Sequence, residues 1–364
     1  MKRKTFLAIS SICLLLLMIF AISKGSVEIE FSIIVNSIIE WINKGMDGVS
    51  ADDSIRFIIF NVRMPRIILS VLTGGLLSMA GATYQAIFQN PMADPYVMGV
   101  SSGAAFGATL AIVFLPTAMF VGYAAVNIIA FLFAILITAI VFLLSRTKNG
   151  VDTFSVLLSG IVISSVLSSF ISLIMFIHND EAMKIITWTM GSFNAKSWDH
   201  VLTILVPTVI GFVLTLYHGK DLNVLVMGEE EAVGMGLDVK KLKRNLLLIC
   251  ALLTSVAVSV SGIIGFVGLI VPHFIRLIFG SDHRFMLPAS MIFGGMFMLF
   301  CDTIARSILG TFEIPVGIIT SLIGGPLFLV LLIKHKRSQK IWLKLKIYIS
   351  VSEKNKFLKI LIWK

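Results

Sequence analysis

Ten apolar runs, each near the length of a membrane-crossing helix, constrain this chain more than any other feature. A helix needs about 20 apolar residues to cross about 30 Å of hydrocarbon. Bounded by charge, glycine and proline, the runs cover residues 6–23, 66–87, 98–115, 119–144, 154–177, 200–217, 246–262, 263–279, 287–305 and 316–333. Residues 246–279 are continuously apolar, so a turn is expected there at Ser261-Gly262 or Gly265. We therefore expect an all-α polytopic membrane protein with about ten transmembrane helices.

The composition excludes a soluble fold. Charged residues make up 14% of the chain and hydrophobic residues 57%, whereas soluble proteins carry about 25% charged residues. The apolar runs are also too long for the alternating strands of a membrane barrel. Cys13, Cys250 and Cys301 lie scattered in apolar stretches, which offers neither a disulfide framework nor a metal-binding pair, so we interpret them as packing residues.

The net charge of +10 is concentrated at the two ends of the chain. Residues 334–364 carry ten Lys or Arg against the single acid Glu353, and Lys2, Arg3 and Lys4 precede the first run. Basic termini beside apolar spans indicate cytoplasmic anchors at a lipid bilayer and no nucleic-acid partner. An even number of spans with the N-terminus inside also places the other basic connectors, at 146–148, 240–244 and 276–284, in the cytoplasm. We expect a multi-pass protein of the cell membrane with both termini cytoplasmic.

Three further segments need an interpretation of their own. Residues 178–199 are too polar to span, yet 183–190 has an apolar face, which favours an interfacial helix on the outer side. Residues 338–364 mix basic and apolar side chains, which predicts a basic amphipathic cytoplasmic tail on anionic lipid, after a transmembrane domain of residues 1–337. The N-terminal run also fits a signal peptide, but its length favours a span.

The chain shows little intramembrane chemistry. Ionisable groups in mid-span are costly and mark function, and almost none are present. Asp302 and Arg306 lie near the end of a span at i, i+4 spacing, which predicts an intrahelical ion pair worth well under about 1 kcal/mol. A lone His273 at a helix end is interpreted as structural, so we predict no metal ligands and no cofactor. The sequence has no GxxxxGK[ST] loop and no catalytic constellation, so we predict that it is no enzyme and that any ATP dependence comes from a partner.

The polar segment 218–245 is the connector best suited to such a partner. Its stretch 228–237 begins with acidic residues, which favour a helix N-terminus, and contains glycines that suit a sharp exit. A short solvated helix would have the same pattern, so this signal alone is weak.

Three blocks of residues carry a family resemblance. They are Arg63-Met64-Pro65-Arg66 with Gly74-Gly75-Leu76, Gly81, Gln85, Asn90 to Pro95, Gly99 and Ser102-Gly103-Ala104; Ser261 to His273 with Arg276, Gly280, Asp282-His283-Arg284 and Pro288; and Asp302, Ala305-Arg306, Glu313, Pro315-Val316-Gly317 and Gly324-Gly325-Pro326. In this order they resemble the FecCD-type permeases, which import iron-siderophores, haem and cobalamin. The resemblance covers residues 56–336 and implies the transmembrane subunit of a type II ABC importer.

The resemblance also implies partners. It predicts a homodimer or paired permease, a cytoplasmic ATP-binding subunit and an extracytoplasmic substrate-binding protein. An iron-siderophore is the expected substrate, with haem and cobalamin as alternatives within the family. A secondary transporter or a channel is the alternative of another class, and it would require intramembrane acids or broken helices at mid-depth.

Site residues follow from the resemblance as well. Arg63, Arg66 and Arg306 are expected to dock the binding protein, although arginines at these positions could also anchor helices at the headgroups. The expected coupling residues toward the ATPase are Gly228, Glu229, Ala232 and Gly236. Thr153 is a candidate gate, but Phe154 stands where the cobalamin member has a second small hydroxyl residue.

Overall fold

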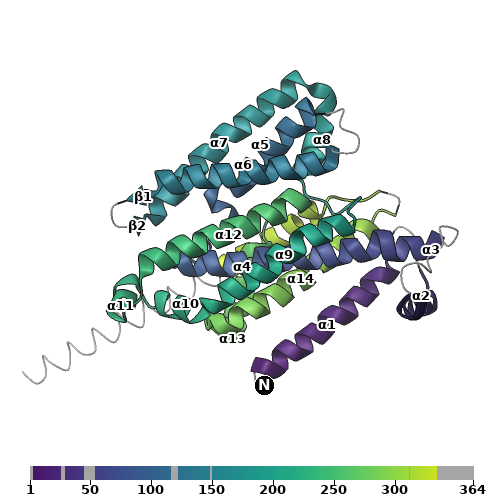
Figure 1. Cartoon of the computed structure of the whole chain (residues 1–364), viewed down its shortest axis with the longest axis horizontal. Helices are drawn as coiled ribbons and strands as arrows, with labels where there is room; N and C mark the ends of the chain where they lie inside the picture. The colour runs from purple at the N-terminus through teal and green to yellow at the C-terminus, as the bar shows by residue number, and fades with distance from the viewer. Residues whose placement is uncertain are drawn as a thin grey trace, which may run out of the picture. The chain divides into compact units, whose positions relative to one another are not determined.

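The computed structural model describes residues 3–25, 29–44, 54–115, 122–147, 150–310 and 312–333. By internal contacts the chain divides into two compact units, Met1–Ser321 and Leu322–Lys364. The first unit holds the helices labelled in Figure 1. The predicted tail 338–364 lies outside the described residues, so it stays a prediction.

The described residues contain eight helices that are long and apolar enough to cross a membrane. They are α1 (Arg3–Ser23), the long helix Ser54–Ile87 that ends in α4 (Met64–Ile87), α6 (Gly122–Leu144), α7 (Thr153–Ile177), α9 (Trp198–Tyr217), α12 (Val239–Ser261), α14 (His283–Ser307) and a helix over Val316–Ile333. The shorter apolar helices α5 (Val100–Phe114) and α13 (Val267–Phe279) occupy the two other predicted spans. The all-α membrane fold is therefore confirmed.

Helix α4 forms the centre of the first unit. It packs against α14, α13, α12 and α9, and most of its residues are buried (Figure 1). It begins earlier than the predicted span, because α3 (Ser54–Phe57) and the π-helical turn η2 (Ile58–Arg63) lead directly into it. Pro65 has no N–H to donate, and its ring would clash with a regular α-helical turn before it. The wider π-helical turn accommodates this ring, so the helix can continue through Pro65.

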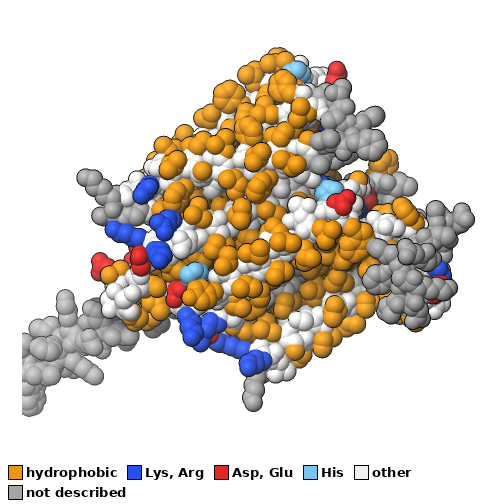
Figure 2. Space-filling model, viewed as in Figure 1, with side chains coloured by type: hydrophobic (Ala, Val, Ile, Leu, Met, Phe, Trp, Pro, Cys, Tyr) orange, Lys and Arg blue, Asp and Glu red, His pale blue; other side chains and the backbone are white. Residues whose placement is uncertain are grey.

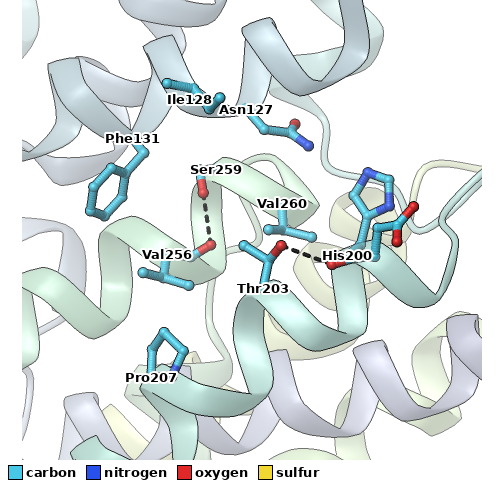
Figure 3. A pocket seen from close by; sticks show the side chains of 10 residues that line it. Asn127, Ile128, Phe131, His200, Thr203, Pro207, Val256, Ser259 and Val260 are labelled. Atoms are coloured by element: carbon cyan, nitrogen blue, oxygen red, sulfur yellow. Dashed lines mark hydrogen bonds between the residues drawn. The ribbon is translucent and has the colours of Figure 1, made fainter. Parts of the chain in front are cut away.

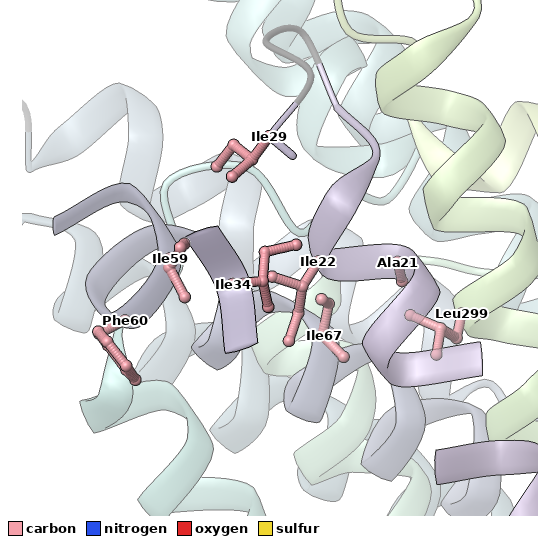
Figure 4. Packing of buried hydrophobic residues seen from close by; sticks show 8 residues of the cluster. All are labelled: Ala21, Ile22, Ile29, Ile34, Ile59, Phe60, Ile67 and Leu299. Carbon is pink, nitrogen blue, oxygen red and sulfur yellow. The ribbon is translucent and has the colours of Figure 1, made fainter. Parts of the chain in front are cut away.

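Between the first two predicted spans, the described residues 29–44 and 54–62 are largely helical, which corrects the expected start of the second span at residue 66. Helix α2 (Phe31–Lys44) lies in the first of these ranges. Figure 4 shows its Ile34 beside Ile22 of α1, in one buried cluster with Ile59 and Phe60 of η2. The sequence predicts the start of this span after Arg63 and Pro65, because charge and proline usually mark boundaries. Buried apolar side chains nevertheless precede them, Ile59 and Phe60 among them.

The predicted turn in the run 246–279 is confirmed. Helix α12 ends at Ser261, Gly262 adopts a φ of 73°, and α13 begins at Val267. Tyr96, from the 3-10 helix η3 (Pro95–Met98), bonds to this turn: its hydroxyl lies 2.9 Å from the carbonyl oxygen of Ile264. The Tyr96 hydroxyl therefore links the non-helical segment before α5 to the one before α13 by a hydrogen bond inside the bundle.

Glycines allow the central helices to approach very closely. A Cβ placed on Gly81 of α4 would lie 1.8 Å from the carbonyl oxygen of Gly268 in α13. A Cβ on Gly74 would likewise lie 2.3 Å from the carbonyl oxygen of Gly294 in α14. The expectation that small residues bring backbones together is confirmed at these crossings.

Helices α5, α6 and α7 form a second group, with α8 (Asn179–Thr189) beside it (Figure 1). The short strands β1 (Arg146–Thr147) and β2 (Gly150–Val151) connect α6 to α7. The helix predicted within 178–199 is confirmed. Its buried face packs against other helices of the chain: Ile185 is 1% exposed and packs with Ala105, Val113 and Ile171. Met183 on the same helix stays 70% exposed.

Candidate functional site

The predicted site residues lie at two ends of the helix bundle. The end that carries Arg63, Arg66 and Arg306 is called the arginine end, where η2, α4 and the last turn of α14 meet. The end that carries α10 (Gly219–Leu225) and α11 (Glu229–Gly234) is called the coupling end, where α12 and α14 begin.

At the arginine end, Arg66 binds two carboxylates from distant parts of the chain. Its Nε and Nη2 donate to Asp302 Oδ1 over 3.1 and 2.9 Å, and its Nη1 donates to Glu313 Oε2 over 2.8 Å. The Asp302 side chain is fully buried and that of Glu313 is 29% exposed. A guanidinium fork suits such bidentate pairing, so Arg66 fastens α4 to α14 and to the segment that follows it.

Arg63 and Arg306 hold the end of α1. A guanidinium nitrogen of Arg63 donates to the carbonyl oxygen of Ile22, and one of Arg306 donates to that of Ala21. These carbonyls belong to the last turn of α1, where helix C=O groups have no partner within the helix and where positive charge is favoured. The two arginines therefore act as a C-terminal cap supplied by other helices.

The pairing of Asp302 with Arg306 needs a correction. The two groups lie 3.8 Å apart, as their spacing predicts, but neither is at the surface: their side chains are 0% and 4% exposed. The pair belongs to a buried network with Arg66, so the small energy typical of an exposed helix pair does not apply.

Burial also bears on the docking prediction. Arg63, Arg66 and Arg306 are 5%, 6% and 3% exposed. Their guanidinium groups are turned toward the chain's own carboxylates and carbonyls, so they do not present an open charged surface. Docking of a binding protein through these residues therefore stays a prediction.

At the coupling end, the four predicted coupling residues gather around α11. Gly228 precedes the helix with a φ of 142°, and Gly236 follows it with a φ of 85°, conformations that favour glycine. Glu229 forms an ion pair with Lys243 of α12. Ala232 is fully buried, so it packs inward and cannot itself face a partner.

Exposed apolar side chains surround these residues. Met227, Val233 and Met235 are 64%, 62% and 61% exposed. Sequence reasoning missed them, because an apolar residue beside a short helix is usually assigned to packing. Figure 2 shows Lys and Arg gathered over this end and an apolar band over the helices beyond it.

Thr153 is the first residue of α7 and is partly exposed. Asp152 caps this helix by accepting from the Ser155 amide over 2.8 Å and from its hydroxyl over 2.6 Å, bonds that hold the pKa of Asp152 below its usual range. Phe154 beside it is 70% exposed. The gate at Thr153 stays a prediction, since the geometry shows a helix start and no closure.

Helices α7 and α9 differ in what they expose. Ser165, Ser169 and Ser172 are exposed at helical spacing on α7, and each hydroxyl donates to the carbonyl four residues earlier over 2.9–3.0 Å. Their lone pairs stay open to an outside donor. The strongly exposed side chains along the middle of α9 are apolar, Leu202, Val206 and Ile210 among them. Helix α7 also exposes large apolar side chains, Val166 and Phe170 among them, so its serines form a polar stripe within an otherwise apolar surface.

A hollow of about 460 Å³ lies between α6, α9 and α12 (Figure 3). Two of its hydroxyls already donate to backbone: Thr203 to Asp199 over 2.8 Å and Ser259 to Val256 over 2.9 Å. Its wall is mainly apolar. Within the described ranges, no three His, Cys, Asp or Glu side chains gather as metal ligands.

Comparison with known proteins places this geometry in a family. The model of the FecCD transport family matches residues 13–334. The chain belongs to the FecCD transport family. It is 42% identical to the cobalamin import system permease BtuC of Halobacterium salinarum, over 77% of this chain and 74% of that one. It is 38% identical to the hemin transport system permease HmuU of Yersinia pestis, over 80% of this chain and 88% of that one.

A solved structure agrees with this assignment. It is described as an inward-facing conformation of a putative metal-chelate type ABC transporter. It is 31% identical to this chain with a TM-score of 0.78, and the match covers 91% of this chain and 99% of that one. The chain is thus the permease subunit of an ABC importer, a multi-pass membrane protein of the FecCD family. Family membership removes the secondary transporter and the channel from consideration.

Proposed function

We propose that this permease carries a metal chelate, with an iron-siderophore as the substrate, from an extracytoplasmic binding protein to the cytoplasm. The observation that carries the proposal is the stripe of exposed serine hydroxyls on α7, which offers acceptors without fixed charge. Such a face suits a bulky polar chelate that must be passed on and not retained. The relatives named above are haem and cobalamin permeases, and these two chelates remain the alternatives.

In this proposal the coupling end lies in the cytoplasm and the arginine end outside. The support is the distribution of charge, because exposed Lys220, Lys240, Lys241 and Arg244 lie at the coupling end. A cytoplasmic ATPase subunit contacts α11 there through the exposed Met227, Val233 and Met235, with the ion pair of Glu229 and Lys243 holding the helix in place. We expect both chain termini to face the cytoplasm as well, and the chain to pair with a second copy or a related permease.

At the outer side, a substrate-binding protein docks at the arginine end. The buried arginines support this surface from beneath, by fixing the ends of α1, α4 and α14 relative to one another. Charge reversal of Arg63, Arg66 and Arg306 would break that buried network and would not isolate docking. Complementary charge on the partner would instead meet partly exposed groups such as Glu313.

Cysteine accessibility tests the polar face of α7. Ser165→Cys, Ser169→Cys and Ser172→Cys, each in a Cys13→Ser background, are expected to react with a charged, membrane-impermeant thiol reagent, because a substrate path admits water. Val206→Cys on α9 is the matched control and is expected to stay unlabelled, since the strongly exposed side chains around it, Leu202, Val209 and Ile210, are apolar and suit contact with lipid. Equal labelling on both helices, or none on α7, would contradict the proposal.

A further inference from the structure

A cluster of polar side chains joins α10 to the start of α14 and is not explained by packing. It consists of Asn223 on α10, Asp282, which caps α14, His283, the first residue of α14, and Arg3, the first of α1. This set is called the Asn223 clamp. Sequence reasoning missed it, because a single asparagine in a polar connector has no pattern.

The orientation of Asn223 is fixed by its partners. The backbone N–H of His283 donates to Asn223 Oδ1 over 2.7 Å, so this atom must be the oxygen of the amide. The imidazole Nδ1 of His283 lies 2.9 Å from the same oxygen, which makes Nδ1 the protonated nitrogen. The amide nitrogen then donates to Asp282 Oδ1 over 2.8 Å. One side chain on α10 thus bonds both the cap and the first residue of α14.

Asp282 extends the connection to α1. Arg3 Nη1 donates to its Oδ2 over 2.6 Å, and Arg284 Nε donates to its Oδ1 over 3.1 Å. The hydrogen bonds from Arg284 and from Asn223 hold the pKa of Asp282 well below its usual range, so the carboxylate stays ionised. Arg3 also lies over the ring of Phe285, 5.6 Å from its centroid. The first turns of α1 and α14 are therefore tied to one carboxylate.

The other contacts of α10 complete a rigid unit. Gln89, just after α4, donates through Nε2 to the carbonyl oxygen of Leu225 over 2.9 Å. Leu222 and Leu225 are fully buried, and α11 follows α10 after a short turn. A push on α11 therefore reaches α14 by way of Asn223 and α4 by way of Gln89.

We propose that Asn223 is a positioning residue that transmits movement of α10 and α11 to α14 and α1. The inference rests on the proposed contact between α11 and an ATPase subunit. Without the clamp, α10 is still held by its apolar packing and by the Gln89 bond, about which it can tilt. Helix α14 carries Asp302 and Arg306 at its far end, so a rigid connection links the coupling end to the arginine end along one helix.

Distance measurements on the chain alone test the clamp without a partner or a substrate. Nitroxide labels at Val233→Cys on α11 and Phe300→Cys on α14, in a Cys13→Ser background, are expected to give one narrow distance distribution. Asn223→Leu, which keeps the size and removes both hydrogen bonds, is expected to broaden it. Lys220→Ala, at an exposed position of α10, is the matched control and should leave it narrow. An unchanged width in Asn223→Leu would overturn the proposal.

Introducing a like charge separates the clamp from general loss of fold. Asn223→Asp places two carboxylates together and is expected to broaden the distribution in protein that remains monodisperse. A narrow peak in this variant would overturn the role of this bond.

The transmission step is tested with the ATPase subunit bound. Labels at Phe300→Cys on α14 and Leu132→Cys on α6 are expected to shift in distance when ATP and vanadate are added. Asn223→Leu should bind the ATPase and hydrolyse ATP but lose the shift. A shift that survives would overturn transmission through Asn223. A parent chain that binds no ATPase would refute the proposed function instead, and the distance widths of the chain alone would stand.

Discussion

Replacing Asp302 with alanine is expected to destabilise the folded chain by about 3–5 kcal/mol, because it leaves buried guanidinium charge without its main partner. Asp302 is fully buried and accepts from Arg66 over 2.9 Å. Glu313 would remain beside Arg66, but Arg306 would lose the carboxylate that lies 3.8 Å from it. The expected readout is a large fall in the midpoint of thermal unfolding of the purified protein.

Two companion variants make this result specific. Lys184→Ala breaks an exposed pair with Glu181, 2.7 Å apart on α8, and is expected to cost under about 1 kcal/mol. Replacing Arg66 with methionine and Asp302 with leucine together is expected to cost less than the sum of the single changes, because the Arg66 guanidinium is removed together with its main partner and only Arg306 still loses the Asp302 carboxylate. If the unfolding midpoint of Asp302→Ala were no lower than that of Lys184→Ala, the buried network would not stabilise the fold.

Substituting valine for Gly81 is expected to prevent the chain from folding into a stable bundle. The new Cβ would meet the carbonyl oxygen of Gly268 at 1.8 Å, and backbone cannot move aside as a side chain can. Helices α4 and α13 would have to separate along their contact, at a cost above the about 1–3 kcal/mol typical of overpacking. Little monodisperse protein is expected on size-exclusion chromatography.

Gly265 provides the matched control for this change. It lies in the turn before α13, and a Cβ there would have nothing within 4 Å. Gly265→Ala is therefore expected to fold like the parent chain. Comparable yields and unfolding midpoints for Gly81→Val and Gly265→Ala would contradict the close approach of α4 and α13.

The positions of the helices could largely be predicted from the sequence, because apolar length alone decides what can cross a bilayer. The break between α12 and α13 was predictable from Gly262, since few residues other than glycine end a helix with positive φ. The extension of the second span to Ser54 was not, because Arg63 and Pro65 imitate a boundary when their tertiary partners are unknown.

The site was less predictable for a related reason. Sequence spacing pairs Asp302 with Arg306, four residues away, but its closer partner Arg66 is separated by 236 positions. Burial of the arginines is a property of the assembled helices and has no local signal. The same holds for Asn223, whose partner Asp282 comes 59 residues later. Motifs singled out Arg63, Arg66 and Arg306, and only the fold shows what these arginines contact.

Uptake into proteoliposomes tests most directly whether this chain is the permease of an ATP-driven chelate importer. The purified chain alone is expected to hydrolyse no ATP, because its sequence has no phosphate-binding loop. Reconstituted with its ATPase subunit and binding protein, it is expected to accumulate a radioactive iron-siderophore only when ATP is supplied, with haem and cobalamin offered in parallel. Uptake of any of these chelates driven by an ion gradient in the absence of ATP and of an ATPase subunit would contradict the account.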